Sequence, residues 1–207
     1  MAGLNDLVAL DDLAPDQVAQ VRRIYETAFP DELTAPFDDL RVDRMLVRID
    51  ESGPAALALV RDLADAQVDT GWTFLRYYAA GKRGAGVGSL MWKQLTSLLA
   101  MEGRARLLWD VEDPDEPGLS LGLADEHRRR IAFYERLGGR LLPVREYAPP
   151  HDDGHAPRLL LMEQPLLPQS PEPALTDLVE AVFRFRYGCP ASHPATRAAL
   201  ESIAEQP

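Results

Sequence analysis

Apolar residues recur at helical spacing in the first part of the chain. Between Pro15 and Phe29 they stand three or four positions apart, as in one face of an amphipathic helix. Proline suits the first turn of a helix, and Pro30 cannot continue one. The pattern therefore predicts a helix over residues 15–29. The acidic residues 31–43 that follow are expected to form a short second helix or a structured loop.

Strand-like runs come next, at 45–49, 55–61 and 72–79. Residues 51–54 read as a hairpin turn, and the polar residues 62–69 read as a second reversal of the chain. We therefore expect these strands to pair antiparallel. A glycine-rich turn at 81–88 then opens a helix. Its predicted buried face is Val87, Leu90, Met91, Leu95, Leu98 and Leu99.

The later part of the chain alternates between strands and helices. We expect a strand at 106–112, an acidic loop at 113–126 and a helix at 128–137 that ends on Gly138. Two more strands are expected at 141–147 and 158–163. This order of elements predicts an α/β domain over residues 1–165.

Beyond residue 165 the composition changes. Three prolines make a stiff connector, so residues 166–207 are expected to form a proline-rich connector and a helical tail, with a last short helix at 195–204. An apolar stripe in the tail must cover a folded surface of this chain or of a second copy. A homodimer is slightly favoured because two-fold dimers are the commonest assemblies. The stripe is formed by Leu175, Leu178, Val179, Val182 and Phe183.

Charge and composition limit the functional class. The formal net charge of −11 argues against nucleic acid as a partner, because binding phosphates needs clustered lysine and arginine. The opening residues lack a signal-peptide pattern, and no run approaches a membrane span, so a cytoplasmic protein without membrane contact is expected. His151 and His155 share a turn with two aspartates, which we interpret as a polar loop, and no metal site is expected.

The glycine turn can hold an anion with its backbone. The first amides of a helix have no internal partners, and the helix dipole adds partial positive charge there. Lys82 and Arg83 bring positive charge to the same place. The spacing fits neither a Walker loop nor a dinucleotide fingerprint. A plain glycine-rich turn that binds nothing stays open at this point.

Two motifs resemble the GNAT acyltransferase superfamily. Residues 83–88, Arg-Gly-Ala-Gly-Val-Gly, resemble its Q/R-x-x-G-x-G/A signature between the fourth strand and the next helix. Residues 132–138, Ala-Phe-Tyr-Glu-Arg-Leu-Gly, resemble its A-x-x-F-Y-x-x-x-G helix in a compressed form. The resemblance implies a mixed, mostly antiparallel sheet splayed between strands 4 and 5 and flanked by helices. It also implies acetyl-CoA as co-substrate and a small-molecule or peptide amine as acceptor.

The resemblance also implies a set of cofactor contacts. Pantetheine would bond to the strand around Tyr77, Tyr78 and Ala79. The pyrophosphate would meet the turn. Arg129 stands where many members have asparagine, and Gly139 replaces a common aromatic, which we expect to loosen the packing. The residues of the turn are Lys82, Arg83, Gly84, Ala85, Gly86, Val87 and Gly88.

Acyl transfer to an amine also needs proton transfer. The resemblance implies that Tyr134 protonates the coenzyme A sulfur; the alternative is a tyrosine that only packs. Asp110 and Glu112 lie two apart on a predicted strand and so share a face, where mutual repulsion would make one of them a better base. An exposed acidic edge is the alternative for both.

The sequence leaves other functions open. A non-catalytic acyl-CoA-binding or regulatory module would keep the glycine turn and lose the function of Tyr134. An unrelated α/β interaction protein would use the apolar tail as its partner surface. Fold alone does not decide between them.

Overall fold

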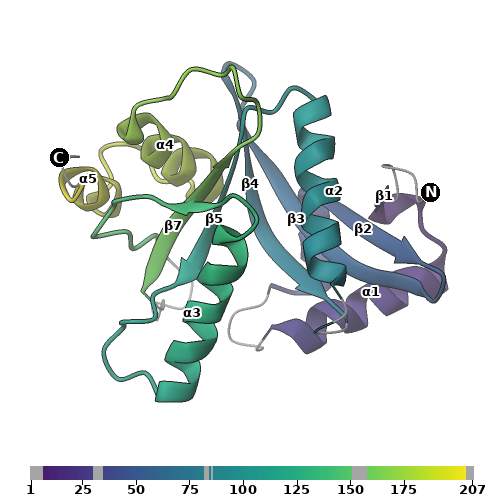
Figure 1. The fold of residues 1–207 in the computed structure, drawn as a ribbon. Coiled ribbons are helices and arrows are strands. Elements are labelled where there is room, and N and C mark those ends of the chain that lie inside the picture. Colours follow the sequence, from purple (N-terminus) through teal and green to yellow (C-terminus); the bar gives the residue numbers. More distant parts are fainter. Residues whose placement is uncertain (1–6, 30–34, 82–83, 85, 151–157, 204–207) are drawn as a thin grey trace. The chain divides into compact units, whose positions relative to one another are not determined.

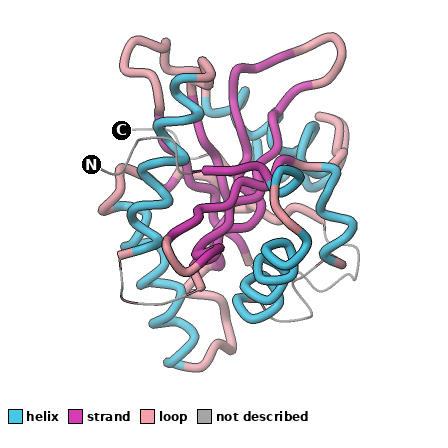
Figure 2. Tube along the Cα trace, turned by 90° about the vertical axis from the view of Figure 1, so that its right-hand side faces the viewer, coloured by secondary structure: helices cyan, strands magenta, loops and turns pink. Residues whose placement is uncertain are grey.

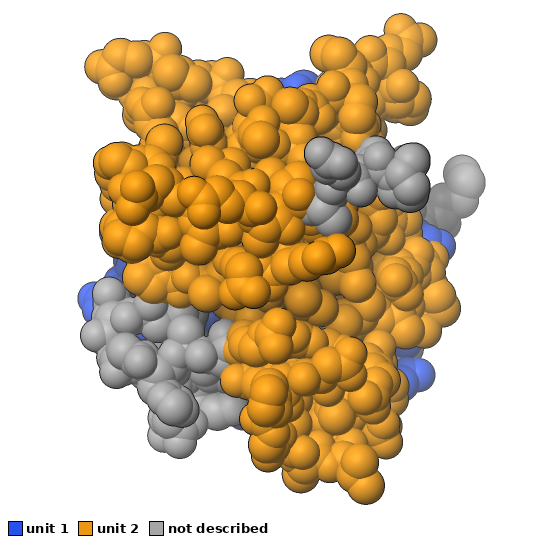
Figure 3. Space-filling view, turned by 90° about the vertical axis from the view of Figure 1, so that its left-hand side faces the viewer, with its two compact units in different colours: residues 1–61, 75–103 blue, residues 62–74, 104–207 orange. Residues whose placement is uncertain are grey.

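In the computed structural model, residues 7–29, 35–81, 84, 86–150 and 158–203 are described. The chain divides into two compact units. Unit 1 comprises residues 1–61 and 75–103, and unit 2 comprises residues 62–74 and 104–207; Figure 3 colours them blue and orange. The predicted domain boundary at residue 165 stays a prediction, whereas the described part of the tail belongs to unit 2.

The strands of the described residues form a seven-stranded sheet in the order β1-β2-β3-β4-β5-β7-β6, with the strands drawn in magenta in Figure 2. Pairing is mostly antiparallel, and β4 and β5 are parallel. The predicted α/β class with a mixed sheet is confirmed, and the predicted opening between the fourth and fifth strands stays a prediction. The strands are β1 (Leu7–Ala9), β2 (Arg44–Asp50), β3 (Gly53–Ala64), β4 (Asp69–Ala80), β5 (Arg106–Glu112), β6 (Arg140–Leu141) and β7 (Leu159–Pro165).

The helices of unit 1 contact alternate side chains of its strands. Figure 1 shows α1 and α2 beside these strands. Helix α1 (Pro15–Ala28) shares an apolar cluster with odd-numbered residues of β2 and β3, such as Met45 and Leu57. Helix α2 (Val87–Met101) contacts the other side, where Gln94 accepts a 2.7 Å hydrogen bond from Arg48 on β2. The alternation follows from the two-residue period of a strand. A 3₁₀ helix, η3 (Phe37–Val42), lies within the segment predicted as a short helix or loop.

Unit 2 contains helix α3 (Leu121–Glu135) and the described tail. The tail forms α4 (Leu175–Ala181), a π-helix η4 (Val182–Arg186) and α5 (Pro194–Glu201). Its apolar stripe is buried in one cluster with strand residues of the same unit, because water would otherwise contact large side chains. This cluster, called the tail core below, includes Leu63, Phe74, Leu108, Leu161, Leu178, Val179, Val182 and Phe183.

Two predicted elements have clearly wrong bounds, and one residue of a predicted buried face is exposed. Helix α3 begins at Leu121, seven residues earlier than predicted, because the Ser120 hydroxyl caps the amide of Leu123. The predicted strand at 141–147 is limited to β6, since Pro143 has no amide to continue a ladder. On α2, Leu90 is 44% exposed, while Trp92 is buried in its place.

Candidate active site

The glycine turn of unit 1 joins the end of β4 to the start of α2. Gly84 and Gly86 have φ angles of 82° and 74°, a left-handed conformation that favours glycine. Gly86 is the N-cap residue of α2, and it has no side chain with which to cap the helix. The first amides of α2 therefore depend on another partner, as at other helix N-termini that bind anions. A Cβ atom built on Gly86 would meet no atom within 4 Å.

Tyr77 and Tyr78, on β4 before the turn, pack against different helices of unit 1. The ring of Tyr77 packs at 5.1 Å from the rings of Tyr25 and Phe29, on the α1 side. The ring of Tyr78 packs edge-on to Trp92 of α2, and its hydroxyl donates a hydrogen bond to the carbonyl oxygen of Gly88. Both side chains thus hold the strand against its own helices, and Tyr78 also ties β4 to the first turn of α2.

The structure describes only some of the other residues predicted to contact the cofactor. Val87 and Gly88 are the first two residues of α2, and the side chain of Ala79 is buried in the cluster beneath α1. Lys82, Arg83 and Ala85 lie outside the described residues, as does the loop with His151 and His155. The cofactor contacts of the turn therefore stay predictions.

In unit 2, Tyr134 lies near the end of α3 and is 7% exposed. Its ring centroid is 5.0 Å from that of Trp109 on β5. Burial raises the pKa of Tyr134, the nearby charge of Arg130 lowers it, and Glu112 raises it again; the net direction is upward. The hydroxyl therefore keeps its proton at neutral pH, as a proton donor must.

Glu112 is held by an arginine instead of facing a second carboxylate. Both of its carboxylate oxygens accept hydrogen bonds from one terminal nitrogen of Arg130 on α3. Burial is the largest single effect and lowers the pKa of Arg130, but the charge and hydrogen bonds of Glu112, together with Tyr134 and Glu126, raise it by more, so the net direction is upward. Arg130 thus stays a cation beside Tyr134.

Asp110 has different partners, from the tail and the segment after β6. Its two carboxylate oxygens accept hydrogen bonds from the hydroxyls of Tyr147, at 2.6 Å, and Tyr187. Burial and the charge of Asp110 raise the pKa of both tyrosines well above the usual value, so both remain donors. The predicted repulsion between Asp110 and Glu112 is therefore replaced by separate stabilising partners for each carboxylate.

Other polar residues of α3 also have defined environments. The side chain of Arg129 donates to the backbone carbonyl of Asp125, so its predicted cofactor contact stays a prediction. Arg128 forms ion pairs with Asp115 and Asp125. His127, which the sequence pattern did not single out, is buried, and its Nδ1 has no partner within the described part of the chain.

Two kinds of feature are absent from the part of the chain that the structure describes. The described residues contain no group of three or more histidine, cysteine, aspartate or glutamate side chains that could hold a metal ion. They also contain no helix long and apolar enough to cross a membrane.

By sequence, neither the family models nor the curated proteins give a match. Solved structures do match. A protein from Bacteroides thetaiotaomicron, described as belonging to the GNAT family of acetyltransferases, is 17% identical with a TM-score of 0.64, covering 88% of this chain and 98% of its own. The aminoglycoside 6′-N-acetyltransferase of Enterococcus faecium is 13% identical with a TM-score of 0.55, covering 80% and 99%. A Bacillus subtilis acetyltransferase in complex with CoA is 10% identical with a TM-score of 0.52, covering 78% and 98%.

The chain therefore has the fold of the GNAT acetyltransferases, as the two sequence motifs predicted. Identities of 10–17% establish the fold and leave the reaction open.

Proposed function

We propose that this protein is an N-acetyltransferase that transfers the acetyl group of acetyl-CoA to an amine. The observation that carries the proposal is Gly86, a left-handed glycine N-cap at the start of α2, in the turn that follows β4. It leaves the first amides of α2 without a side-chain cap and lets a phosphate approach the backbone closely. A CoA-bound solved structure with the same fold supports CoA as the ligand class.

Three parts of the chain have roles in the proposal. Lys82, Arg83 and the amides of residues 84–88 bind the pyrophosphate, and the backbone at 77–79 bonds to the pantetheine. Arg129 on α3 contacts the cofactor. Tyr134 in unit 2 donates its proton to the departing thiolate. The buried hydroxyl of Tyr134 carries its proton at neutral pH, and its raised pKa makes it a weaker acid that needs a stabilising group to release the proton.

We propose that Asp110 or Glu112 is the base that takes the proton of the amine. Either carboxylate would first have to give up a hydrogen-bond partner. Asp110 would have to release a tyrosine hydroxyl, and Glu112 would have to release Arg130. An amine that reaches the protein unprotonated still loses one N–H proton on acylation, and a water molecule would accept that proton in place of either carboxylate. The acceptor amine, a small molecule or a peptide, determines whether a carboxylate or water accepts this proton.

Two variants, one at each end of α2, test the proposed binding of CoA. Gly86 and Gly103 stand at opposite ends of α2, have φ angles of 74° and 80°, and leave open space for a Cβ atom. Aspartate at either position brings similar backbone strain. At Gly86 only, it also places a negative charge at the proposed phosphate site.

We expect Gly86→Asp to weaken CoA binding about 100-fold in calorimetry, the loss of one or two charge-assisted hydrogen bonds, and Gly103→Asp to keep it. Equal affinity of both variants would remove the assignment of the turn. A screen of amines with acetyl-CoA and mass detection then tests catalysis. Binding without any acetylated product would favour the non-catalytic acyl-CoA module.

A further inference from the structure

The charge pair Glu112–Arg130 lies beside the proposed proton donor. Arg130 and Tyr134 are four positions apart on α3, the spacing that puts two side chains on the same face of a helix. Glu112, the last residue of β5, binds Arg130, and the ring of Trp109 on the same strand contacts that of Tyr134. One strand and one helix of unit 2 therefore bring together a carboxylate, a guanidinium and a phenol.

Two hydrogen bonds and an ion pair join Arg130 to Glu112. A single terminal nitrogen of Arg130 binds both oxygens of Glu112, whose side chain is 17% exposed. Screening by water is weaker at such a half-buried site than at the surface, so its charges act more strongly on neighbouring groups. The guanidinium keeps further donors beyond the nitrogen that binds Glu112.

We propose that Arg130, fixed by Glu112, is a positioning residue that stabilises the negative charge on the oxygen of Tyr134 during proton transfer. In this step the O–H bond of Tyr134 breaks, and an S–H bond forms on the thiolate released from acetyl-CoA. The electron pair of the O–H bond stays on the tyrosine oxygen. The inference rests on the proposed function, in which Tyr134 is the proton donor.

The charged groups that act on Tyr134 oppose one another. On its own helix, the charge of Arg130 favours the ionised phenol; from β5, Glu112 disfavours it. Glu126, one turn before Arg130, acts on the charge of Arg130. Loss of Arg130 and loss of Glu112 should therefore change the acidity of Tyr134 in opposite directions, provided that Arg130 stays in place. Loss of packing alone would give no such opposition.

The experiment measures the acidity of Tyr134 without any substrate. A fluorinated tyrosine, which ionises at lower pH than tyrosine, is placed at position 134 of the full chain, and its ¹⁹F resonance is followed across pH. Arg130→Met should raise the titration midpoint by about one pH unit, the usual order for a neighbouring charge, and Glu112→Gln should lower it. Arg130→Lys should keep the midpoint near that of the unaltered chain.

Arg128→Met is the matched control, because Arg128 lies on the same helix and pairs with Asp115 and Asp125 instead. It should leave the midpoint unchanged. The proposal is overturned if Arg130→Met leaves the midpoint unchanged or lowers it. Circular dichroism shows which variants are folded, and Arg130→Lys decides the matter if Arg130→Met does not fold: a midpoint raised as far as one pH unit with lysine would count against a charge effect.

Turnover separates this inference from the proposed function. With any accepted amine, Arg130→Met should lower kcat about tenfold and leave the KM for acetyl-CoA nearly unchanged, since one pH unit of acidity corresponds to a factor of ten. If the unaltered chain acetylates no amine, the proposed function fails while the titrations still report the coupling. If turnover is normal in Arg130→Met, the positioning role fails alone.

Discussion

The indole of Trp109 lies directly against the α-carbon of Gly139: a Cβ atom at Gly139 would stand 2.8 Å from two ring carbons of Trp109 and 3.1 Å from the carbonyl oxygen of Tyr134. The expectation that this glycine loosens the packing is therefore wrong. The glycine makes room for Trp109, which contacts Tyr134. We expect Gly139→Ala to lower the free energy of unfolding by about 1–3 kcal/mol, the usual cost of overpacking a core. Urea unfolding measures it.

Gly122→Ala is the control for that substitution. Gly122 lies in the first turn of α3, and a Cβ atom there would meet nothing within 4 Å. Alanine is favoured over glycine in helices by about 1 kcal/mol, so this variant should be neutral or more stable. Equal destabilisation by both substitutions would show that the contact with Trp109 carries no cost.

A second prediction concerns Tyr78, whose hydroxyl binds the carbonyl oxygen of Gly88. Tyr78→Phe removes this link between β4 and α2 while the ring still packs on Trp92. If the turn binds pyrophosphate, its amides lose a constraint, and CoA affinity should fall about 3- to 10-fold, the effect of one hydrogen bond of about 1 kcal/mol. Calorimetry with CoA measures it. An unchanged dissociation constant would limit Tyr78 to packing.

Local patterns predicted much of the fold because their causes are local. Strand β5 was predicted at its observed bounds, and α1 within one residue. The start of α3 was missed because residues 121–126 combine glycine and acidic side chains, which dilute the helical period. The strand β1, three residues long, gives too short a pattern to recognise. On α2, Leu90 and Trp92 both fit an apolar stripe, and only the neighbouring strands decide which is buried.

The candidate site was also predictable only where its residues are neighbours in sequence. The glycine turn is contiguous in sequence, so its motif was visible. The partners of Asp110 are not, because Tyr147 and Tyr187 follow it by 37 and 77 positions. The pairing of Glu112 with Arg130 also depends on how α3 packs on β5. Sequence spacing placed the two carboxylates on one face, but it could not supply these partners.

Tyr134 gives the third prediction. Tyr134→Phe removes the proposed proton donor and keeps the ring that packs on Trp109. With an accepted amine we expect kcat to fall on the order of 100-fold, with little change in the KM for acetyl-CoA. Steady-state release of CoA measures both. Phe133→Leu, a change to the neighbouring ring, is the control and should cost less than the loss of the hydroxyl. A kcat unaffected by Tyr134→Phe would leave Tyr134 as a packing residue.

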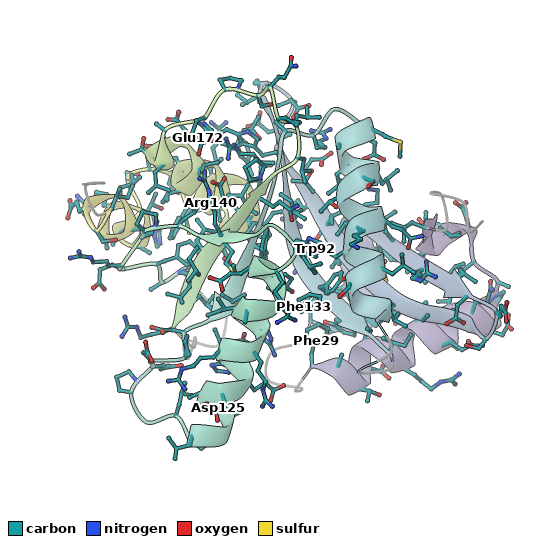
Figure 4. The ribbon with its side chains drawn as sticks, viewed as in Figure 1. Phe29, Trp92, Asp125, Phe133, Arg140 and Glu172 are labelled. Atoms are coloured by element: carbon teal, nitrogen blue, oxygen red, sulfur yellow. The ribbon has the colours of Figure 1, made fainter. Side chains whose placement is uncertain are left out.

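A fourth prediction concerns acid stability. Glu172 in the proline-rich connector binds Arg106 at 2.6 Å and also pairs with Arg140, whose side chain lies near it in Figure 4. The hydrogen bond from Arg106, followed by that from Arg140, holds the pKa of Glu172 below its usual range. A carboxyl group whose pKa is lowered in the folded state adds stability above its unfolded pKa, and this contribution is lost as the pH falls.

Glu172→Gln should therefore lower the Tm at pH 7 and have a smaller effect near pH 3. Because the side chain of Glu172 is 61% exposed, we expect a contribution of only about 1 kcal/mol or less. Glu201→Gln, at an exposed position of α5, is the control. A Tm difference that is constant from pH 7 to pH 3 would contradict the assigned ion pairs.

The last prediction tests how strongly the tail stabilises unit 2. Phe183 is fully buried in the tail core and packs on Tyr147, whereas Phe185, two positions later in the same π-helix, is half-buried beneath the guanidinium of Arg184. Phe183→Ala should lower the free energy of unfolding by about 3–5 kcal/mol, a large share of the stability of a typical domain, and Phe185→Ala should lower it clearly less. Urea unfolding measures both variants.

Truncation after Pro168 would remove the whole stripe and should leave a protein that melts far below the full chain, or that does not remain in solution. Since the stripe is already covered within unit 2, the mass in solution of the full chain should not depend on it. Equal losses for the two phenylalanines, or a truncated chain with an unchanged Tm, would show that the tail adds little to the stability of this unit.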